Sequence, residues 1–139
     1  MAVLVMNGRK SIAALDDALL YGILDMGYVA EAEMQRVAEA LLAGGVGALQ
    51  LRAKGYDEAG VLRLLQEVAP RIVEVCKTYE VPFIINDFPD VAVSVGADGV
   101  HIGQDDGSLA EVRAVVGEQM IVGRSTHSPD QARAAMSEG

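Results

Sequence analysis

Short apolar runs alternate with longer amphipathic stretches along the chain from Leu20 to its end. A short apolar run bounded by turn residues is typical of a buried strand, and apolar residues at helical spacing are typical of a surface helix. The pattern predicts strands at residues 20–24, 48–52, 83–86, 99–102 and 120–123. It predicts helices at 31–43, 57–80, 91–95, 108–116 and 129–137, with a further short helix over 12–19.

Residues at the ends of these helices support the assignment. Asp57 and Ser108 are residue types that favour helix N-caps, and Gly117 stands where a C-terminal glycine is expected. Pro70 lies within the stretch 57–80, where it removes a backbone donor. We therefore expect that helix to be kinked or split.

Regular alternation of strands and helices predicts parallel strands joined by right-handed crossovers. Two architectures satisfy this pattern, an open doubly wound sheet and part of a barrel. The length of 139 residues alone favours the open sheet, because a complete barrel needs about 250 residues. However, Gln50, Arg52 and Lys54 alternate with Leu51 and Ala53, so three polar side chains share one face. A helix would bury that face in a doubly wound sheet, whereas the mouth of a barrel leaves it accessible to water.

The fold class expected from these arguments is therefore α/β, as an incomplete TIM (β/α)8 barrel of about five βα units. We expect residues 1–139 to form a single barrel domain that stops before a sixth strand, with residues 1–19 as an N-terminal extension. Five strands leave two sheet edges unpaired, and such edges promote association. A homo-oligomer is the expected state.

Composition excludes several classes of partner. The formal net charge is −9 and no basic stripe is present, so we expect no nucleic-acid partner. The apolar run at residues 2–6 is too short to span a membrane, and Arg9 and Lys10 follow it instead of preceding it as in a secretory signal. The single cysteine, Cys76, lies among apolar helical positions and is interpreted as a buried hydrophobe. We expect a cytoplasmic protein without membrane contact.

Polar side chains gather where the predicted strands end. Parallel strands place such ends at one rim, where the sites of α/β proteins form. Arginine and lysine bind phosphate oxygens, and Mg²⁺ prefers a few carboxylates together with the phosphate oxygens of a substrate. The residues at these ends are Gln50, Arg52, Lys54, Asn86, Asp87, Gln104, Asp105, Asp106, Ser125, Thr126 and His127.

The carboxylates of Asp87 and Asp106 follow adjacent strands, so we expect both to reach one Mg²⁺ ion. In contrast, Asp90 and Asp105 are interpreted as solvated loop side chains. His101 lies between Val100 and Ile102 within a strand and is interpreted as a packed, hydrogen-bonded core histidine. For His127 a site role and a solvated position remain equally open. Together these residue types predict a site for a phosphate ligand that binds with Mg²⁺.

Four strings at the predicted strand ends carry a family resemblance. In chain order they are QLRAK (50–54), IND (85–87), GADGVHIGQDD (96–106) and GRSTH (123–127). Together they resemble thiamine phosphate synthase over about residues 21–139. The resemblance implies a transferase of thiamine biosynthesis that needs Mg²⁺. Its partners would be two small molecules, 4-amino-2-methyl-5-hydroxymethylpyrimidine diphosphate and a thiazole phosphate, which it joins with release of pyrophosphate by a dissociative substitution.

The resemblance also implies roles for individual residues. Gln50 would hydrogen-bond the aminopyrimidine, and Arg52, Lys54 and Asn86 would contact the pyrophosphate. Ser125 would lie next to the reacting groups, so that Ser125, Lys54 and Arg52 form the catalytic set. The metal ligands would be Asp87 and Asp106, and His127 joins the substrate-binding residues.

Three departures from the family pattern keep alternatives open. Phe88 stands where the family usually has a basic residue. The chain also stops before the family's later phosphate-binding loops, so we doubt that these 139 residues are active by themselves. Finally, GRSTH is similar to the thiazole tautomerase family, whose matching histidine transfers protons. The remaining alternatives are a non-catalytic, diphosphate-binding half-barrel and, less favoured, a flavodoxin-like domain.

Overall fold

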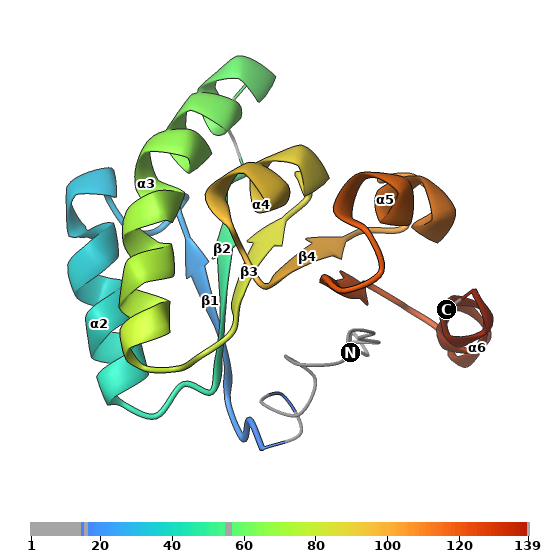
Figure 1. Ribbon diagram of the computed structural model, residues 1–139, viewed down its shortest axis with the longest axis horizontal. Coiled ribbons are helices and arrows are strands. Elements are labelled where there is room, and N and C mark those ends of the chain that lie inside the picture. The colour runs from blue at the N-terminus through green and yellow to red at the C-terminus, as the bar shows by residue number, and fades with distance from the viewer. Residues whose placement is uncertain (1–14, 16, 55–56, 139) are drawn as a thin grey trace.

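A parallel five-stranded sheet forms the centre of the computed structural model, which describes residues 15, 17–54 and 57–138 (Figure 1). The strands lie side by side in the order in which they occur in the sequence, and every neighbouring pair is parallel. Sequential order confirms the barrel interpretation and excludes the doubly wound sheet, in which the order reverses. The strands are β1 (Tyr21–Asp25), β2 (Ala48–Arg52), β3 (Phe83–Asn86), β4 (Gly99–Ile102) and β5 (Ile121–Arg124).

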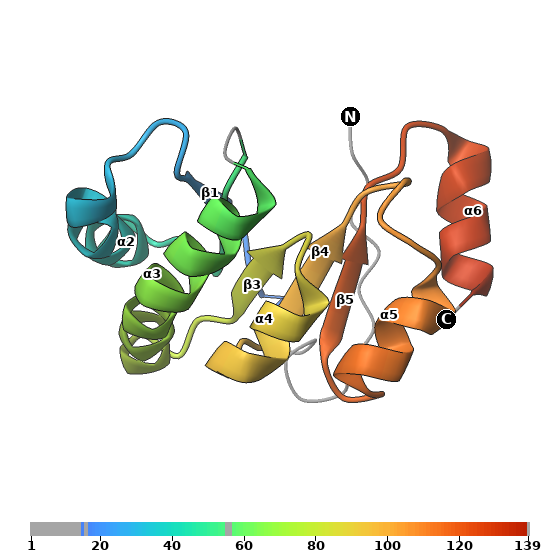
Figure 2. The same cartoon turned by 90° about the horizontal axis from the view of Figure 1, so that it is seen from above.

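Helices follow the strands and lie along the outer face of the curved sheet (Figure 2). The helix at 31–43 begins as a 3-10 turn, η1 (Glu31–Glu33), before it continues as α2 (Met34–Ala43). The others are α3 (Glu58–Thr78), α4 (Pro89–Val95), α5 (Leu109–Val116) and α6 (Pro129–Ser137). Of the expected helix at 12–19, residues 12–14 and 16 lie outside the described residues. Leu15 is helical but residues 17–19 form a turn and a bend, so the helix does not continue to residue 19 as expected. Within the described part of the chain, no helix is long and apolar enough to cross a membrane.

The predicted strands agree closely with the structure. Three of them match it residue for residue, and β1 and β5 each begin and end one residue later than predicted. The shift of β1 has a clear cause, since Leu20 is exposed whereas Asp25 pairs with Arg52 at the end of the ladder. A hydrophobicity pattern does not detect a strand that ends on a charged residue.

Pro70 does not split its helix, so of the two expected outcomes the split is wrong. α3 runs without a break from Glu58 to Thr78 with Pro70 inside it. The proline is exposed, so water can reach the carbonyl group that has lost its backbone donor. Residues on both sides of it, Val68, Ala69 and Ile72 among them, are buried in the same core, so packing stabilises the helix before and after the proline.

The two faces of the sheet bury different kinds of side chain. Alternate strand residues pack against the helices and form the main apolar core, which includes Leu24, Leu49, Leu51, Phe83, Ile85, Val100, Ile102 and Val122. The residues between them face the concave side of the sheet. On that side, Ile84 and Ile121 are fully buried and fill the space near the amino-terminal ends of the strands. The carboxyl-terminal half carries the polar residues.

Gly99 allows that apolar closure. A Cβ atom at this position would lie 2.6 Å from Ile84 Cδ1 and 2.8 Å from Ile121 Cβ. These distances are shorter than van der Waals contact, so the two isoleucines occupy the space that a side chain of residue 99 would need. Glycine in a strand interior costs conformational entropy, and close packing explains its use here.

Candidate active site

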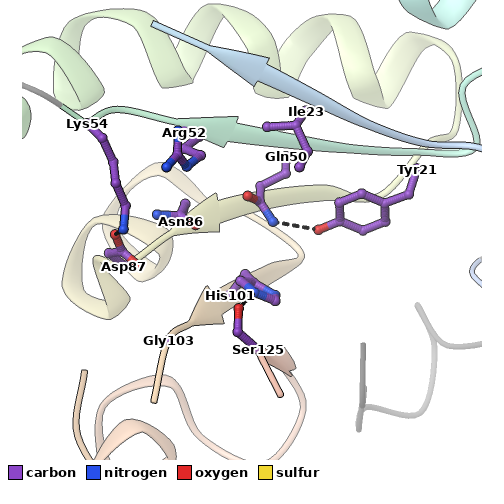
Figure 3. Close-up of a pocket in the computed structure, with 10 residues that line it drawn as sticks. All are labelled: Tyr21, Ile23, Gln50, Arg52, Lys54, Asn86, Asp87, His101, Gly103 and Ser125. Atoms are coloured by element: carbon purple, nitrogen blue, oxygen red, sulfur yellow. Dashed lines mark hydrogen bonds and ion pairs between the residues drawn. The ribbon is translucent and has the colours of Figure 1, made fainter. Parts of the chain in front are cut away.

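A cavity of about 450 Å³ opens at the carboxyl ends of the strands, on the concave side of the sheet (Figure 3). Every strand or the loop that follows it contributes to its wall, which is the arrangement expected of a barrel active site. The lining residues are Tyr21, Ile23, Gln50, Arg52, Lys54, Asn86, Asp87, His101, Gly103 and Ser125.

Strand β2 supplies the cationic wall. Gln50, Arg52 and Lys54 all line the cavity, as the alternation of polar and apolar residues predicted (Figure 3). Lys54 Nζ lies 3.4 Å from Asp87 Oδ2, and the guanidinium of Arg52 is paired with Asp25. Both cations therefore stand beside carboxylates that come from neighbouring strands.

The end of β3 has an unusual backbone conformation. Asp87 has φ 69°, in the left-handed region that few residues other than glycine adopt. Its amide donates to His101 O at 2.8 Å, which holds it in this conformation. The preceding Asn86 is buried, and its Nδ2 has no hydrogen-bond partner among the described atoms. An unpaired buried amide donor is costly unless a ligand binds it, so Asn86 indicates a ligand with an acceptor group.

The second carboxylate lies close to Asp87. Burial and then the negative charge of Asp106 raise the pKa of Asp87, and Lys54 opposes that rise. The carboxylate of Asp106 is oriented by the amide of Gly103, which donates to Oδ2 at 2.6 Å. A Cβ at 103 would stand 2.7 Å from the same oxygen, so a larger residue there would displace the Asp106 carboxylate.

These two carboxylates fit a hard cation. They repel each other, and a divalent ion between them would remove that repulsion. In the described part of the chain, no three His, Cys, Asp or Glu side chains gather as a metal site. A complete cage of protein ligands is not what Mg²⁺ requires, because it commonly takes one or two carboxylates and completes its shell with water and phosphate oxygens.

Strands β4 and β5 are joined by a hydrogen bond inside the cavity. His101 Nε2 and Ser125 Oγ lie 2.9 Å apart, and Ser125 N donates to Ile102 O at 2.9 Å. Gln104 Nε2 also donates to Ser125 O, which fixes the start of the loop after β5. Burial lowers the pKa of His101, and Asp106 partly offsets this effect. His101 is buried and hydrogen-bonded as expected, but it also lines the cavity with its Nδ1 unpartnered in the described structure.

Strand β1 contributes residues that the sequence interpretation missed. The hydroxyl of Tyr21 accepts a hydrogen bond of 2.9 Å from Gln50 Nε2, and burial raises the pKa of this tyrosine to about 12. Ile23 forms an apolar part of the wall and is 55% exposed. Tyr21, Ile23 and Asp25 alternate along one face of the strand, but in the sequence alone nothing distinguishes them from ordinary strand residues.

Other candidates lie away from this cavity. His127 is exposed and lines a separate hollow of about 500 Å³ together with Pro129 and Met136 of α6. Its backbone amide donates to Gln131 Oε1 at 2.7 Å. The structure thus does not bring His127 to Gln50 or Asn86. Phe88 is half-buried against the core beside α4, so it adds no charge near Asp87.

A parallel βα sheet in sequential strand order, with its polar side chains gathered at the carboxyl-terminal rim, is the architecture of a (β/α) barrel. The family model described as thiamine monophosphate synthase matches residues 20–139. The chain belongs to this family.

Individual relatives agree with this assignment. Thiamine-phosphate synthase of Halalkalibacterium halodurans is 42% identical over 122 residues, which cover 86% of this chain and 54% of the relative. Thiamine-phosphate synthase of Thermus thermophilus is 44% identical over 113 residues, with 81% and 52% covered. The solved thiamine phosphate pyrophosphorylase from Pyrococcus furiosus superposes with a TM-score of 0.74 at 27% identity, over 90% of this chain and 58% of that one. The chain therefore spans about half the length of these curated relatives.

Proposed function

We propose that this chain provides the diphosphate site of a thiamine phosphate synthase. This enzyme joins 4-amino-2-methyl-5-hydroxymethylpyrimidine diphosphate to a thiazole phosphate and releases pyrophosphate. The proposal rests on one observation above all: Arg52, Lys54, the unpaired amide of Asn86 and the Asp87 carboxylate line a single cavity. Membership of the family and relatives named for this activity support it.

Three side chains would bind the diphosphate. Arginine offers several donors in a planar fork and lysine a mobile point charge, so Arg52 and Lys54 can follow phosphate oxygens as charge develops on them. Asn86 Nδ2 would donate to a third oxygen, which would satisfy its buried donor. Diphosphate is strongly negative and the chain has a formal net charge of −9, so we expect a bound cation to offset their repulsion.

Asp87 and Asp106 would hold that cation, Mg²⁺. When bound, Mg²⁺ would supply positive charge that stabilises the departing diphosphate. The fit is supported by the proximity of the two carboxylates, since the charge of Asp106 adds to burial in raising the pKa of Asp87. Displacement of Lys54 from Asp87 would free its ammonium group for the diphosphate.

The pyrimidine would occupy the part of the cavity between β1 and β5. Gln50, which is held by Tyr21, would hydrogen-bond the aminopyrimidine. The Ser125 hydroxyl, supported by His101, would lie beside the reacting carbon. Ile23 offers an apolar surface for the ring.

The side chains of the cavity favour a dissociative reaction. The bond between the pyrimidine methylene carbon and the diphosphate oxygen breaks, and its electron pair leaves with the oxygen. Arg52 and Lys54 stabilise the charge that develops on this leaving group. The thiazole nitrogen then bonds to the carbocation, so the catalytic set Ser125, Lys54 and Arg52 acts without a covalent intermediate. His127 and the hollow beside α6 are the candidates for contact with the thiazole phosphate. We also expect the protein to act in the cytoplasm as a homo-oligomer.

Product analysis tests the proposal. A full-length synthase that contains this chain is incubated with both substrates and Mg²⁺, and thiamine phosphate and pyrophosphate are quantified by chromatography with mass detection. We expect both products in equal amounts, and loss of both in Asp87→Asn. The control Asp105→Asn removes an exposed carboxylate one residue from Asp106 and should keep full activity. Binding of the pyrimidine diphosphate without turnover would instead identify a non-catalytic diphosphate-binding protein.

A further inference from the structure

Asp25 and Arg52 form an ion pair at the rim of the cavity, and the family resemblance gives Asp25 no role. Asp25 is the last residue of β1 and is the direct ladder partner of Arg52 on β2. Arg52 Nη1 donates to Asp25 Oδ2. The side chain of Asp25 is 13% exposed and that of Arg52 35%, so the pair is shielded from water more than the ion pairs on the helices.

The aspartate itself is held rigidly. Its other carboxylate oxygen, Oδ1, accepts a hydrogen bond of 2.8 Å from the amide of Gly27. Its carbonyl oxygen accepts from the amides of Tyr28 and Val29 at 3.0 and 3.1 Å, which closes the turn after β1. The backbone also crosses to β2, because Met26 N donates to Arg52 O at 2.8 Å. Asp25 is therefore a fixed point from which a neighbouring side chain can be oriented.

Arg52, in contrast, would be mobile without this contact. An arginine side chain has several rotatable bonds, and ordering it when a ligand binds costs free energy. A guanidinium that is held through one amino group keeps its remaining donors for a second acceptor. Arg52 lines the cavity (Figure 3). It does so while it is paired with Asp25, so the pair orders the cation before any ligand arrives.

We infer that Asp25 is a positioning residue, which orders the Arg52 guanidinium for the diphosphate of the substrate. The inference rests on the proposed function, since it assumes that Arg52 binds diphosphate. Two effects of Asp25 oppose each other, because its negative charge also weakens the attraction of Arg52 for an anion. Positioning dominates here, since Asp25 is fixed by Gly27 and leaves the other donors of the guanidinium available.

A double-mutant cycle on pyrophosphate binding tests this inference. Affinities for pyrophosphate in the presence of Mg²⁺ are measured by calorimetry for the unmodified chain, Asp25→Asn, Arg52→Gln and the double variant. Asparagine keeps an oxygen acceptor for the Gly27 amide but removes the charge. We expect Asp25→Asn to weaken binding about 10-fold, the size of a lost charge-assisted contact. In the Arg52→Gln background the same change should have almost no effect on affinity. If Asp25 acts only through Arg52, the effects of the two substitutions on binding free energy do not add.

The control is Asp130→Asn, which breaks the same kind of pair on the surface of α6, where Asp130 is 91% exposed and bonded to Arg133. It should leave pyrophosphate affinity unchanged. If Arg52→Gln weakens binding and Asp25→Asn does not, or tightens it, the positioning inference is wrong and the proposed function stands. Equal losses from Asp25→Asn in both backgrounds would also overturn it, since Asp25 would then act independently of Arg52. If Arg52→Gln itself binds pyrophosphate normally, the proposed diphosphate site is wrong.

Discussion

Lys54 and Asp87 form an ion pair across two neighbouring strands, with Lys54 Nζ 3.4 Å from Asp87 Oδ2. Asp87 also lies near Asp106, so its carboxylate is attracted by the Lys54 ammonium and repelled by the Asp106 carboxylate. The ammonium group thus lies beside the carboxylate that we propose as a ligand of Mg²⁺. Lysine and metal ion would compete for the same oxygen atoms.

Lys54→Gln should therefore change two affinities in opposite directions. We expect Mg²⁺ alone to bind about three- to ten-fold more tightly, since a cation within about 4 Å of the ligand is removed. Pyrophosphate should bind more weakly, because the variant lacks one of its two cations. Calorimetry with each ligand measures both effects, and Lys77→Gln, which removes an exposed lysine paired with Glu74, is the matched control. Weaker Mg²⁺ binding in Lys54→Gln would rule out the competition.

Protonation of His101 should destabilise the protein at low pH. Burial lowers its pKa in the folded state below the value of about 6.5 expected for an unfolded chain. As pH falls through that value, the unfolded chain takes up a proton that the folded protein does not, so stability falls with it. Above that value both states are neutral and His101 makes no contribution to the pH dependence.

We therefore expect a smaller loss of stability between pH 7.5 and 5.5 for His101→Gln than for the unmodified chain. Urea midpoints at the two pH values measure it. The control His127→Gln removes an exposed histidine and should keep the original pH dependence. An equal loss in all three proteins would show that burial of His101 does not govern this transition.

Gly99→Ala should destabilise the sheet. The added methyl group would meet Ile84 Cδ1, Ile121 Cβ and the Ile121 carbonyl at 2.6, 2.8 and 2.9 Å. Overpacking of this kind costs about 1–3 kcal/mol. Combining it with Ile84→Val removes the nearest atom and should recover part of the loss, which thermal unfolding can detect. If Gly99→Ala is as stable as the unmodified chain, the packing of these isoleucines is looser than described.

Periodicity was enough to predict the strand order and most of the cationic wall. Gln50, Arg52 and Lys54 alternate with apolar residues. The side-chain period of a strand is two, so they share one face whichever strands lie beside β2. The contribution of β1 was not predicted, because Tyr21 and Ile23 look like ordinary strand residues. Their role arises only when the parallel ladder sets Ile23 beside Gln50 and Asp25 beside Arg52. Likewise, α3 continues through Pro70 because residues on both sides of the proline are buried in the core. The helix propensity of single residues does not predict this packing.

His101 illustrates the same limit. Its apolar neighbours Val100 and Ile102 correctly indicated a buried position. Burial in a barrel can mean either the helix-facing core or the floor of the site, and the two faces alternate along each strand. The pairing of His101 with Asn86 and Gly123 in the ladder decides between them.

The most direct test of the central claim is a calorimetric titration of pyrophosphate into the protein, once with Mg²⁺ and once with a chelator. The account predicts binding of one pyrophosphate per chain that weakens at least about 10-fold without Mg²⁺, since two carboxylates near the site repel an anion that has no metal with it. Asp87→Asn should lose this dependence on Mg²⁺, whereas Asp105→Asn should keep it. Equal affinity with and without Mg²⁺, or an Asp87→Asn variant indistinguishable from the unmodified chain, would contradict a magnesium diphosphate site at these strand ends.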